Sequence, residues 1–450
     1  MWMKCCRALP WLSKWVQPSR ILIALLPSTP PVLKSWLQCG NMDGAHLFDP
    51  ATAVLLGCLF LLMLAFLRHY TQKTPLPYEA WIILVGIVYA QIQPHLALLP
   101  PVGFQPEVIM LMILPLLIFA EGRSVHIQSL LQVAYPVAYL AVAGVLFVAA
   151  TIGFSIAWLM GIEPIHGLLL GAALAATDPS AAGVVLRRFS IPEKLLMTIE
   201  GESLFNDGVA IVLFTTIAGL VLFEQQVTFT SVALDTLWIV LAAAPIGWLL
   251  GWVTAKVVVI WSVRNEFTGL TLTIVLAYGT FLLAEHLLHI SGIIAVLFAA
   301  LAFVRGRYTK CEEMKRDGND AFQSFWAYIA TLAGSTVFFM LGVAIGEHTF
   351  VLSWAIPGIV LIVLLSRVAL IYASPWFVSS CRRWPMAWRH VLTLGGLRGA
   401  IPAALVLTIP AEYAYREDFL CLVFVVVTTT LFIQPLLLKT YLKRAPIESD

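Results

Sequence analysis

The sequence predicts an all-α polytopic membrane protein with about 13 transmembrane helices, and composition is the first reason. Of the 450 residues, 60% are hydrophobic and only 12% are charged, whereas roughly 25% of the residues of an ordinary soluble domain are charged. The mean hydropathy is +0.91. This much apolar surface needs lipid as its solvent, so a soluble fold is excluded. The formal net charge of +2 gives no argument for a nucleic-acid partner.

The second reason is the number of apolar stretches that are long enough to cross a bilayer. A hydrocarbon core of about 30 Å needs about 20 mainly apolar helical residues. Thirteen stretches qualify, at 51–67, 79–97, 107–122, 132–160, 165–186, 195–222, 229–255, 267–287, 289–304, 321–346, 350–375, 391–409 and 417–438. The separation of spans 8 and 9 depends on a polar turn predicted at 286–292.

The third reason is the distribution of positive charge between the loops. The loops after odd-numbered spans, together with the C-terminal tail, hold nineteen lysines and arginines, and the loops after even-numbered spans hold only Arg416. Because positive loops stay on the cytoplasmic side, we expect the C-terminus in the cytoplasm and a multi-pass location in the cell (inner) membrane. The leader at 1–50 contradicts this pattern, since it carries five positive residues on the predicted outer side. We expect it to be an extension, with Met42 as the natural start.

The spans also repeat. Adding 216 to the first residues of spans 1, 3 and 4 gives positions close to the first residues of spans 8, 10 and 11. Because span 8 follows span 1 by seven spans, an odd number, the second copy crosses the membrane in the opposite direction and is inverted relative to the first. We therefore expect a six-helix repeat at 51–222, a linking helix at 223–266, an inverted repeat at 267–438 and a short cytoplasmic tail at 439–450. Many secondary transporters have this layout, although regular helix lengths alone would also give the spacing.

Span 5 contains a predicted interruption. Ionisable side chains in mid-membrane cost at least about 2.5 kcal/mol on insertion scales, so their positions are informative. Thr177, Asp178 and Pro179 lie within an apolar run. Pro179 has no N–H and disfavours helical geometry at Asp178, so we expect the helix to break there.

Span 12 contains a second predicted interruption at the repeat-equivalent place, in the sequence G-G-L-R-G-A-I-P at 395–402. Where two interrupted helices cross, their N-terminal ends carry partial positive charge and their C-terminal ends partial negative charge. Asp178 and Arg398 have suitable signs to neutralise these ends.

Span 6 supplies further polar side chains, in E-G-E-S-L-F-N-D-G at 200–208. Ser203 and Asp207 are four residues apart and share a helix face, and Glu202 and Asn206 line the adjacent face. A carboxylate, a serine hydroxyl and loosened carbonyls of Thr177 form a hard oxygen site, which suits a small cation that has lost water.

A purely structural interpretation of these residues also stays open. In it Asp178 only caps a kinked helix, Glu202 pairs with Arg398, and Asp207 hydrogen-bonds a neighbouring span.

The chain resembles the NhaP-type sodium/proton antiporters of the monovalent cation:proton antiporter family. Three motifs in this order carry the resemblance: T-D-P at 177–179, E-G-E-S-L-F-N-D-G at 200–208 and G-L-R-G-A at 396–400. The resemblance covers about residues 50–440. It implies a homodimer in the membrane lipid that exchanges Na+, or Li+ or K+, for H+. No cofactor is implied, because the monovalent cation is the substrate.

The resemblance also implies roles for individual residues. Asp207 would be the carboxylate that holds proton and cation in turn, with Asp178, the main-chain oxygen of Thr177 and Ser203 as co-ligands. Three further residues would support the site: Asn206 would orient it, Glu202 would act through water or be held by Arg398, and Arg367 resembles a family arginine near the core.

A single shared site predicts the mechanism. Burial disfavours a bare carboxylate, so proton and cation displace each other, and only the neutralised site crosses the membrane barrier. The residue next to Asp207 is Asn206, a neutral amide that cannot carry a second proton. We therefore expect one cation to exchange for one proton.

Other functions stay open at this point. A sodium-coupled symporter or a channel would use the same interrupted helices, but spans 5, 6 and 12 offer few polar groups for an organic substrate, and no ring of like charge marks a pore. A membrane metalloenzyme is a remote alternative. Glu285, His286 and His289 superficially resemble a zinc motif, but a polar turn at the end of span 8 explains them better.

Overall fold

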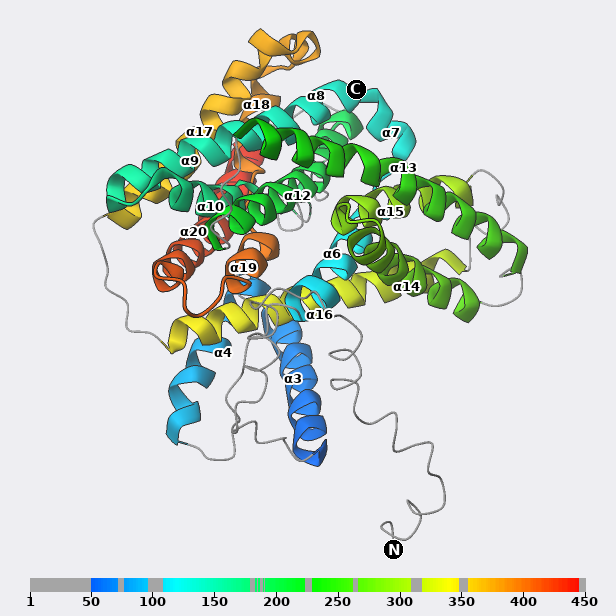
Figure 1. Cartoon of the computed structure of the whole chain (residues 1–450), viewed down its shortest axis with the longest axis horizontal. Coiled ribbons are helices and arrows are strands. Elements are labelled where there is room, and N and C mark those ends of the chain that lie inside the picture. Colours follow the sequence, from blue (N-terminus) through cyan, green and yellow to red (C-terminus); the bar gives the residue numbers. More distant parts are fainter. Residues whose placement is uncertain are drawn as a thin grey trace, which may run out of the picture. The chain divides into compact units, whose positions relative to one another are not determined.

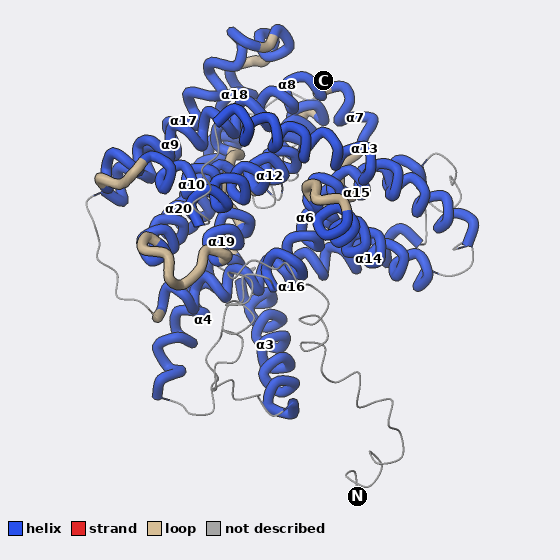
Figure 2. Tube along the Cα trace, viewed as in Figure 1, coloured by secondary structure: helices blue, strands red, loops and turns tan. Residues whose placement is uncertain are grey.

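The described part of the chain is helical. The computed structural model describes residues 50–71, 77–95, 108–178, 183, 185–186, 189, 191–222, 229–261, 266–308, 318–347 and 355–444, and no strand occurs among them (Figure 2). The predicted leader up to residue 49 and Pro179 lie outside the described residues. Contacts divide the chain into two units, Met1–Met63 and Leu64–Asp450. All of the contacts discussed below lie within the second unit.

Each of the thirteen predicted spans contains helical residues. The helices are α3 (Pro50–Thr71), α4 (Tyr78–Ile92), α6 (Leu114–Gly122), α7 (Ile127–Gln132), α8 (Ala134–Tyr139), α9 (Val145–Met160), α10 (Pro164–Ala175), α12 (Glu193–Leu222), α13 (Phe229–Trp261), α14 (Glu266–Leu282), α15 (Gly292–Tyr308), α16 (Gly318–Gly346), α17 (Ala355–Phe377), α18 (Met386–Leu394), α19 (Ala400–Leu407) and α20 (Arg416–Arg444) (Figure 1). By length and composition, eight described helices can cross a membrane. Three shorter apolar helices occupy Ile109–Gly122, Pro164–Ala175 and Gly292–Gly306.

Two predicted spans have local irregularities. The fourth is not one straight helix, because α7 and α8 are separated at Val133 and a π-helical segment, Leu140–Gly144, joins α8 to α9. The eighth ends in a π-helical segment, Leu283–Leu287, followed by a turn in which His289 has φ 53°. The predicted turn between the two spans is therefore confirmed, but it is shorter than 286–292: only 288–291 are non-helical, and α15 begins at Gly292.

The two predicted interruptions are also confirmed. Helix α10 ends at Ala175 and residues 176–178 are not helical. Helix α18 ends at Leu394, and α19 begins at Ala400 after a non-helical stretch. The two stretches touch each other, since the backbone N–H of Asp178 donates to the carbonyl of Leu397 over 2.8 Å. Helix α12 packs against both α10 and α19, so its side chains face the place where the interruptions meet.

Candidate functional site

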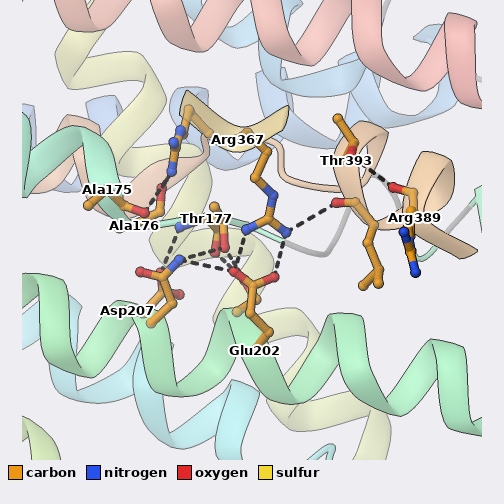
Figure 3. A network of polar contacts seen from close by, with 12 residues as sticks. Ala175, Ala176, Thr177, Glu202, Asp207, Arg367, Arg389 and Thr393 are labelled. Carbon is orange, nitrogen blue, oxygen red and sulfur yellow. Dashed lines mark hydrogen bonds and ion pairs between the residues drawn. The ribbon is translucent and has the colours of Figure 1, made fainter. Parts of the chain in front are cut away.

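Asp207 lies against the interrupted backbone of α10. It comes from the middle of α12 and is 1% exposed. Its Oδ1 accepts a hydrogen bond of 3.1 Å from the backbone N–H of Thr177, which α10 leaves without a helical partner because the helix has ended (Figure 3). A buried carboxylate is thus held by a main-chain donor that a continuous helix would have used itself.

Thr177 is the point on which several side chains of α12 converge. The Ser203 hydroxyl donates to the Thr177 carbonyl, and the Thr177 hydroxyl lies 3.2 Å from the Ser203 hydroxyl. The Asn206 amide donates to the Thr177 hydroxyl over 3.1 Å and to Oε1 of Glu202 over 3.4 Å. The predicted grouping of side chains on two adjacent faces of this helix is therefore confirmed, and both faces reach Thr177.

Arg398 neutralises the C-terminal end of α10, as its sign predicted. Its Nη1 donates to the carbonyls of Ala175 and Ala176 over 2.6 and 2.9 Å. These carbonyls are the negative end of an interrupted helix, and a buried cation there satisfies both the charge and the hydrogen-bonding groups.

Asp178 lies at the opposite kind of helix end. A Cβ atom placed on Gly399, the residue before α19, would overlap the carboxylate of Asp178. The carboxylate therefore packs against the positive N-terminal end of α19, and a side chain at position 399 has no room.

The partner predicted for Glu202 was wrong. Its carboxylate pairs with Arg367 of α17, not with Arg398, through two hydrogen bonds of 2.6 Å each (Figure 3). Arg367 also donates to the carbonyl of Leu392 over 3.1 Å, near the C-terminal end of α18. Arg398 is unsuited to this pairing because its guanidinium is directed at the end of α10.

Glu121 is a member of the site that the sequence analysis missed. It is in the last turn of α6, and its Oε2 is buried with no hydrogen-bond partner. Its carboxyl is close enough to those of Asp207 and Asp178 to interact with both electrostatically. The available signal was a single acid at the end of an apolar stretch. The neighbouring Arg123 is one of the nineteen cations that the sequence analysis assigned to loops and the tail, but it is also buried and donates to Oε1 of Gln323 over 2.5 Å.

Glu285 and His286 lie in the π-helical end of the eighth span, and His289 lies in the turn that follows it. Oε2 of Glu285 accepts a hydrogen bond of 2.9 Å from the backbone N–H of Gly292, the first residue of α15. Glu285 is thus used to cap a helix. In the part of the chain that the structure describes, no three His, Cys, Asp or Glu side chains are grouped to hold a metal ion.

In this membrane protein two interrupted helices meet, and acids and arginines are buried where they meet. These are features of a secondary transporter. The chain belongs to the sodium/hydrogen exchanger family, whose transmembrane model matches residues 58–444. It is therefore a multi-pass membrane transporter and not an enzyme. The resemblance to NhaP-type antiporters is confirmed.

Named relatives support this assignment. The chain is 32% identical over 418 residues to the Na(+)/H(+) antiporter NhaG of Bacillus atrophaeus, covering 90% of this chain and 76% of NhaG. It is 30% identical over 352 residues to the Na(+)/H(+) antiporter NhaP of Pseudomonas aeruginosa, covering 75% of this chain and 81% of that protein. The structure of the sodium proton antiporter MjNhaP1 from Methanocaldococcus jannaschii has the same fold, with a TM-score of 0.67 at 20% identity over 87% of this chain and 96% of MjNhaP1.

Proposed function

We propose that this exchanger moves one sodium ion against one proton by letting both compete for the carboxylate of Asp207. The observation that carries the proposal is the hydrogen bond from the Thr177 N–H to this buried carboxylate. It fixes the orientation of the acid at a break in the helix, where main-chain oxygens are also released from helical hydrogen bonds.

The proposed cation ligands are four oxygen-bearing groups around the interruption of α10. They are the carboxylates of Asp207 and Asp178, the hydroxyl of Ser203 and the main-chain carbonyl of Thr177. Ser203 donates to the Thr177 carbonyl, and a bound cation would replace this hydrogen bond by two oxygen contacts. All four groups are hard ligands, which suit Na+ better than a soft metal.

The remaining polar residues hold the site in place. Asn206 bridges Thr177 and Glu202, so we assign it an orienting role. Glu202 acts through its pair with Arg367 and not as a ligand, since both of its oxygens are already engaged. Arg398 compensates the end of α10. Asn206, Glu202 and Arg398 thereby keep the interrupted backbone in one geometry while Asp207 exchanges a proton for a cation.

Coupling follows from charge. An empty site would expose negative charge to the membrane barrier when the protein changes its access side, whereas either a proton or a cation removes that charge. Only the loaded forms therefore move readily, and the difference in their stability drives exchange.

The wider setting belongs to the same proposal. We infer a homodimer in the cell membrane, built from two inverted six-helix repeats, with the C-terminus in the cytoplasm and with Li+ or K+ as possible replacements for Na+. The alternation of positive loops supports the orientation, and the contact between the two interrupted stretches supports the repeats.

Inside-out membrane vesicles test the function directly. A pH gradient is imposed, its size is followed with a fluorescent dye, and NaCl, LiCl or KCl is then added in turn. We expect Na+ to dissipate the gradient in vesicles with the protein and not in vesicles without it. Dissipation that requires an organic solute as well as Na+ would support the symporter alternative instead.

A further inference from the structure

An apolar groove lies on the outside of the helix pair formed by α13 and α15, which run side by side (Figure 1). The groove has a volume of about 560 Å³ and is lined by Ala244, Pro245, Trp248, Leu249, Trp252 and Phe298. Leu249 is 57% exposed and Trp252 is 43% exposed. Two indole rings and a leucine therefore line the groove, and the described part of this chain does not cover it.

Close packing beneath the groove makes it a fixed feature. A Cβ atom on Gly247 or Gly251 of α13 would overlap the backbone oxygens of Ala295 and Ala299 of α15. Small residues thus let the two backbones approach closely. The groove is lined by side chains of α13 together with Phe298 of α15, the helix that α13 contacts so closely.

Two cations stand at one end of the groove. The Nζ atom of Lys256 lies 3.5 Å from the centre of the Trp252 ring, and the guanidinium of Arg305 lies 5.8 Å from the centre of the Trp248 ring. Both charged side chains are exposed. Each is held by an indole face through a cation–π contact, which positions the charge over the end of an apolar cavity.

The dimensions match one leaflet of a bilayer. Twelve residues separate Ala244 from Lys256, which corresponds to about 18 Å along a helix. Half of a hydrocarbon core of about 30 Å is about 15 Å. An acyl chain in the groove would therefore place its headgroup at the level of Lys256 and Arg305. The sequence puts both residues on the side of the membrane that holds almost all of the loop cations.

We propose that this groove binds an anionic phospholipid of the leaflet on that positively charged side. The acyl chain packs against the tryptophans and Leu249, and the phosphate lies between the two cations, as in other basic pockets between transmembrane helices. A second copy of this chain is a poorer occupant. The lining of the groove is apolar and the charges beside it are Lys256 and Arg305, so a copy docked through the same face would bring cations to cations.

Lipid titrations followed by native mass spectrometry test the proposal. The purified protein in neutral detergent is titrated with dioleoyl phosphatidylglycerol or with dioleoyl phosphatidylcholine. We expect the first phosphatidylglycerol to bind more tightly than phosphatidylcholine, and the K256Q/R305Q double variant to lose about tenfold or more of that preference. The K439Q/K443Q variant, which loses two exposed charges at the end of α20, is the matched control and should keep the preference.

A second variant tests the groove itself. Ala244→Trp fills the cavity without removing charge, so it should abolish the tight first binding event. If this variant does not fold, Leu249→Ala removes one exposed wall and should weaken the same event. Equal binding of the two lipids to the wild type, or an unchanged preference in K256Q/R305Q, overturns the proposal. A change from dimer to monomer in Ala244→Trp with unchanged lipid binding also overturns it, because a second copy would then be the occupant.

Discussion

The carboxylate of Asp207 accepts a hydrogen bond from the backbone N–H of Thr177, 3.1 Å away, directly after the last helical turn of α10. This contact joins two features that depend on each other. The interruption releases the donor, and the donor holds the acid at the interruption. A change in the charge of Asp207 therefore acts on the same stretch of backbone that bonds to the non-helical stretch before α19, through the N–H of Asp178 and the carbonyl of Leu397.

Asp207→Asn should give a folded protein that does not exchange ions. The amide oxygen can still accept from Thr177, but the side chain no longer ionises, so it holds neither a proton nor a cation. Thermal unfolding should resemble that of the wild type, and the vesicle assay should show no dissipation of the pH gradient. Asp418→Asn, at an exposed acid in the first turn of α20, is the control and should stay active. Exchange by Asp207→Asn would identify another acid as the carrier, with Glu121 the first to examine.

Lowering the pH on the side from which sodium enters should raise the half-saturating sodium concentration. At lower pH a larger fraction of Asp207 carries a proton, and more sodium is needed to displace it, while the maximal rate at saturating sodium changes less. Initial rates measured over a series of sodium concentrations at several pH values give this relationship. A half-saturating concentration that is constant over the pH range would mean that proton and cation use different sites.

Glu202→Gln should destabilise the protein strongly. The substitution leaves the guanidinium of Arg367 buried without its bidentate partner, and removing one member of a buried pair typically costs about 3–5 kcal/mol. Arg367→Gln should have an effect of similar size, and the double variant should be less destabilised than the sum of the two. Thermal unfolding of the purified variants measures this. Glu193→Gln, at an exposed acid on the same helix whose Oε1 accepts from Ser129, should change stability by about 0.5 kcal/mol at most. Additive effects in the double variant would show that the pair is not an energetic unit.

The sequence predicted the features of the site that depend on local chemistry. The break after α10 follows from the proline at 179, the break before α19 follows from clustered glycines, and the shared faces of α12 follow from helical spacing. The pairing of Glu202 was not predictable in this way. Arg367 lies 165 residues away, and the sequence argument considered only Arg398 as a charged partner for Glu202, although the two arginines carry equal charge. Only their packing decides between them.

Glu121 was missed for a related reason. A span boundary read from hydropathy does not give the depth of the residue at the boundary, because the end of a helix can lie inside the protein. Here Arg123 directly follows α6 and is buried, so the end of α6 lies within the packed interior. Glu121, which the sequence places at the membrane interface, consequently lies inside the protein, within electrostatic range of Asp207.

Transport by the wild type should not follow an imposed membrane voltage, because one Na+ exchanged for one H+ moves no net charge. Asn206 has no ionisable proton, Glu202 is held by Arg367, and Asp178 packs against the N-terminal end of α19. We therefore expect Asp207 to be the acid that changes its state. Glu121 challenges this expectation, since a second proton carried by it would make the cycle move charge. Proteoliposomes with a potassium diffusion potential measure the effect, and both the wild type and Glu121→Gln should exchange at rates independent of voltage. If the wild type responds to voltage and Glu121→Gln does not, Glu121 carries a second proton and the one-for-one exchange is wrong.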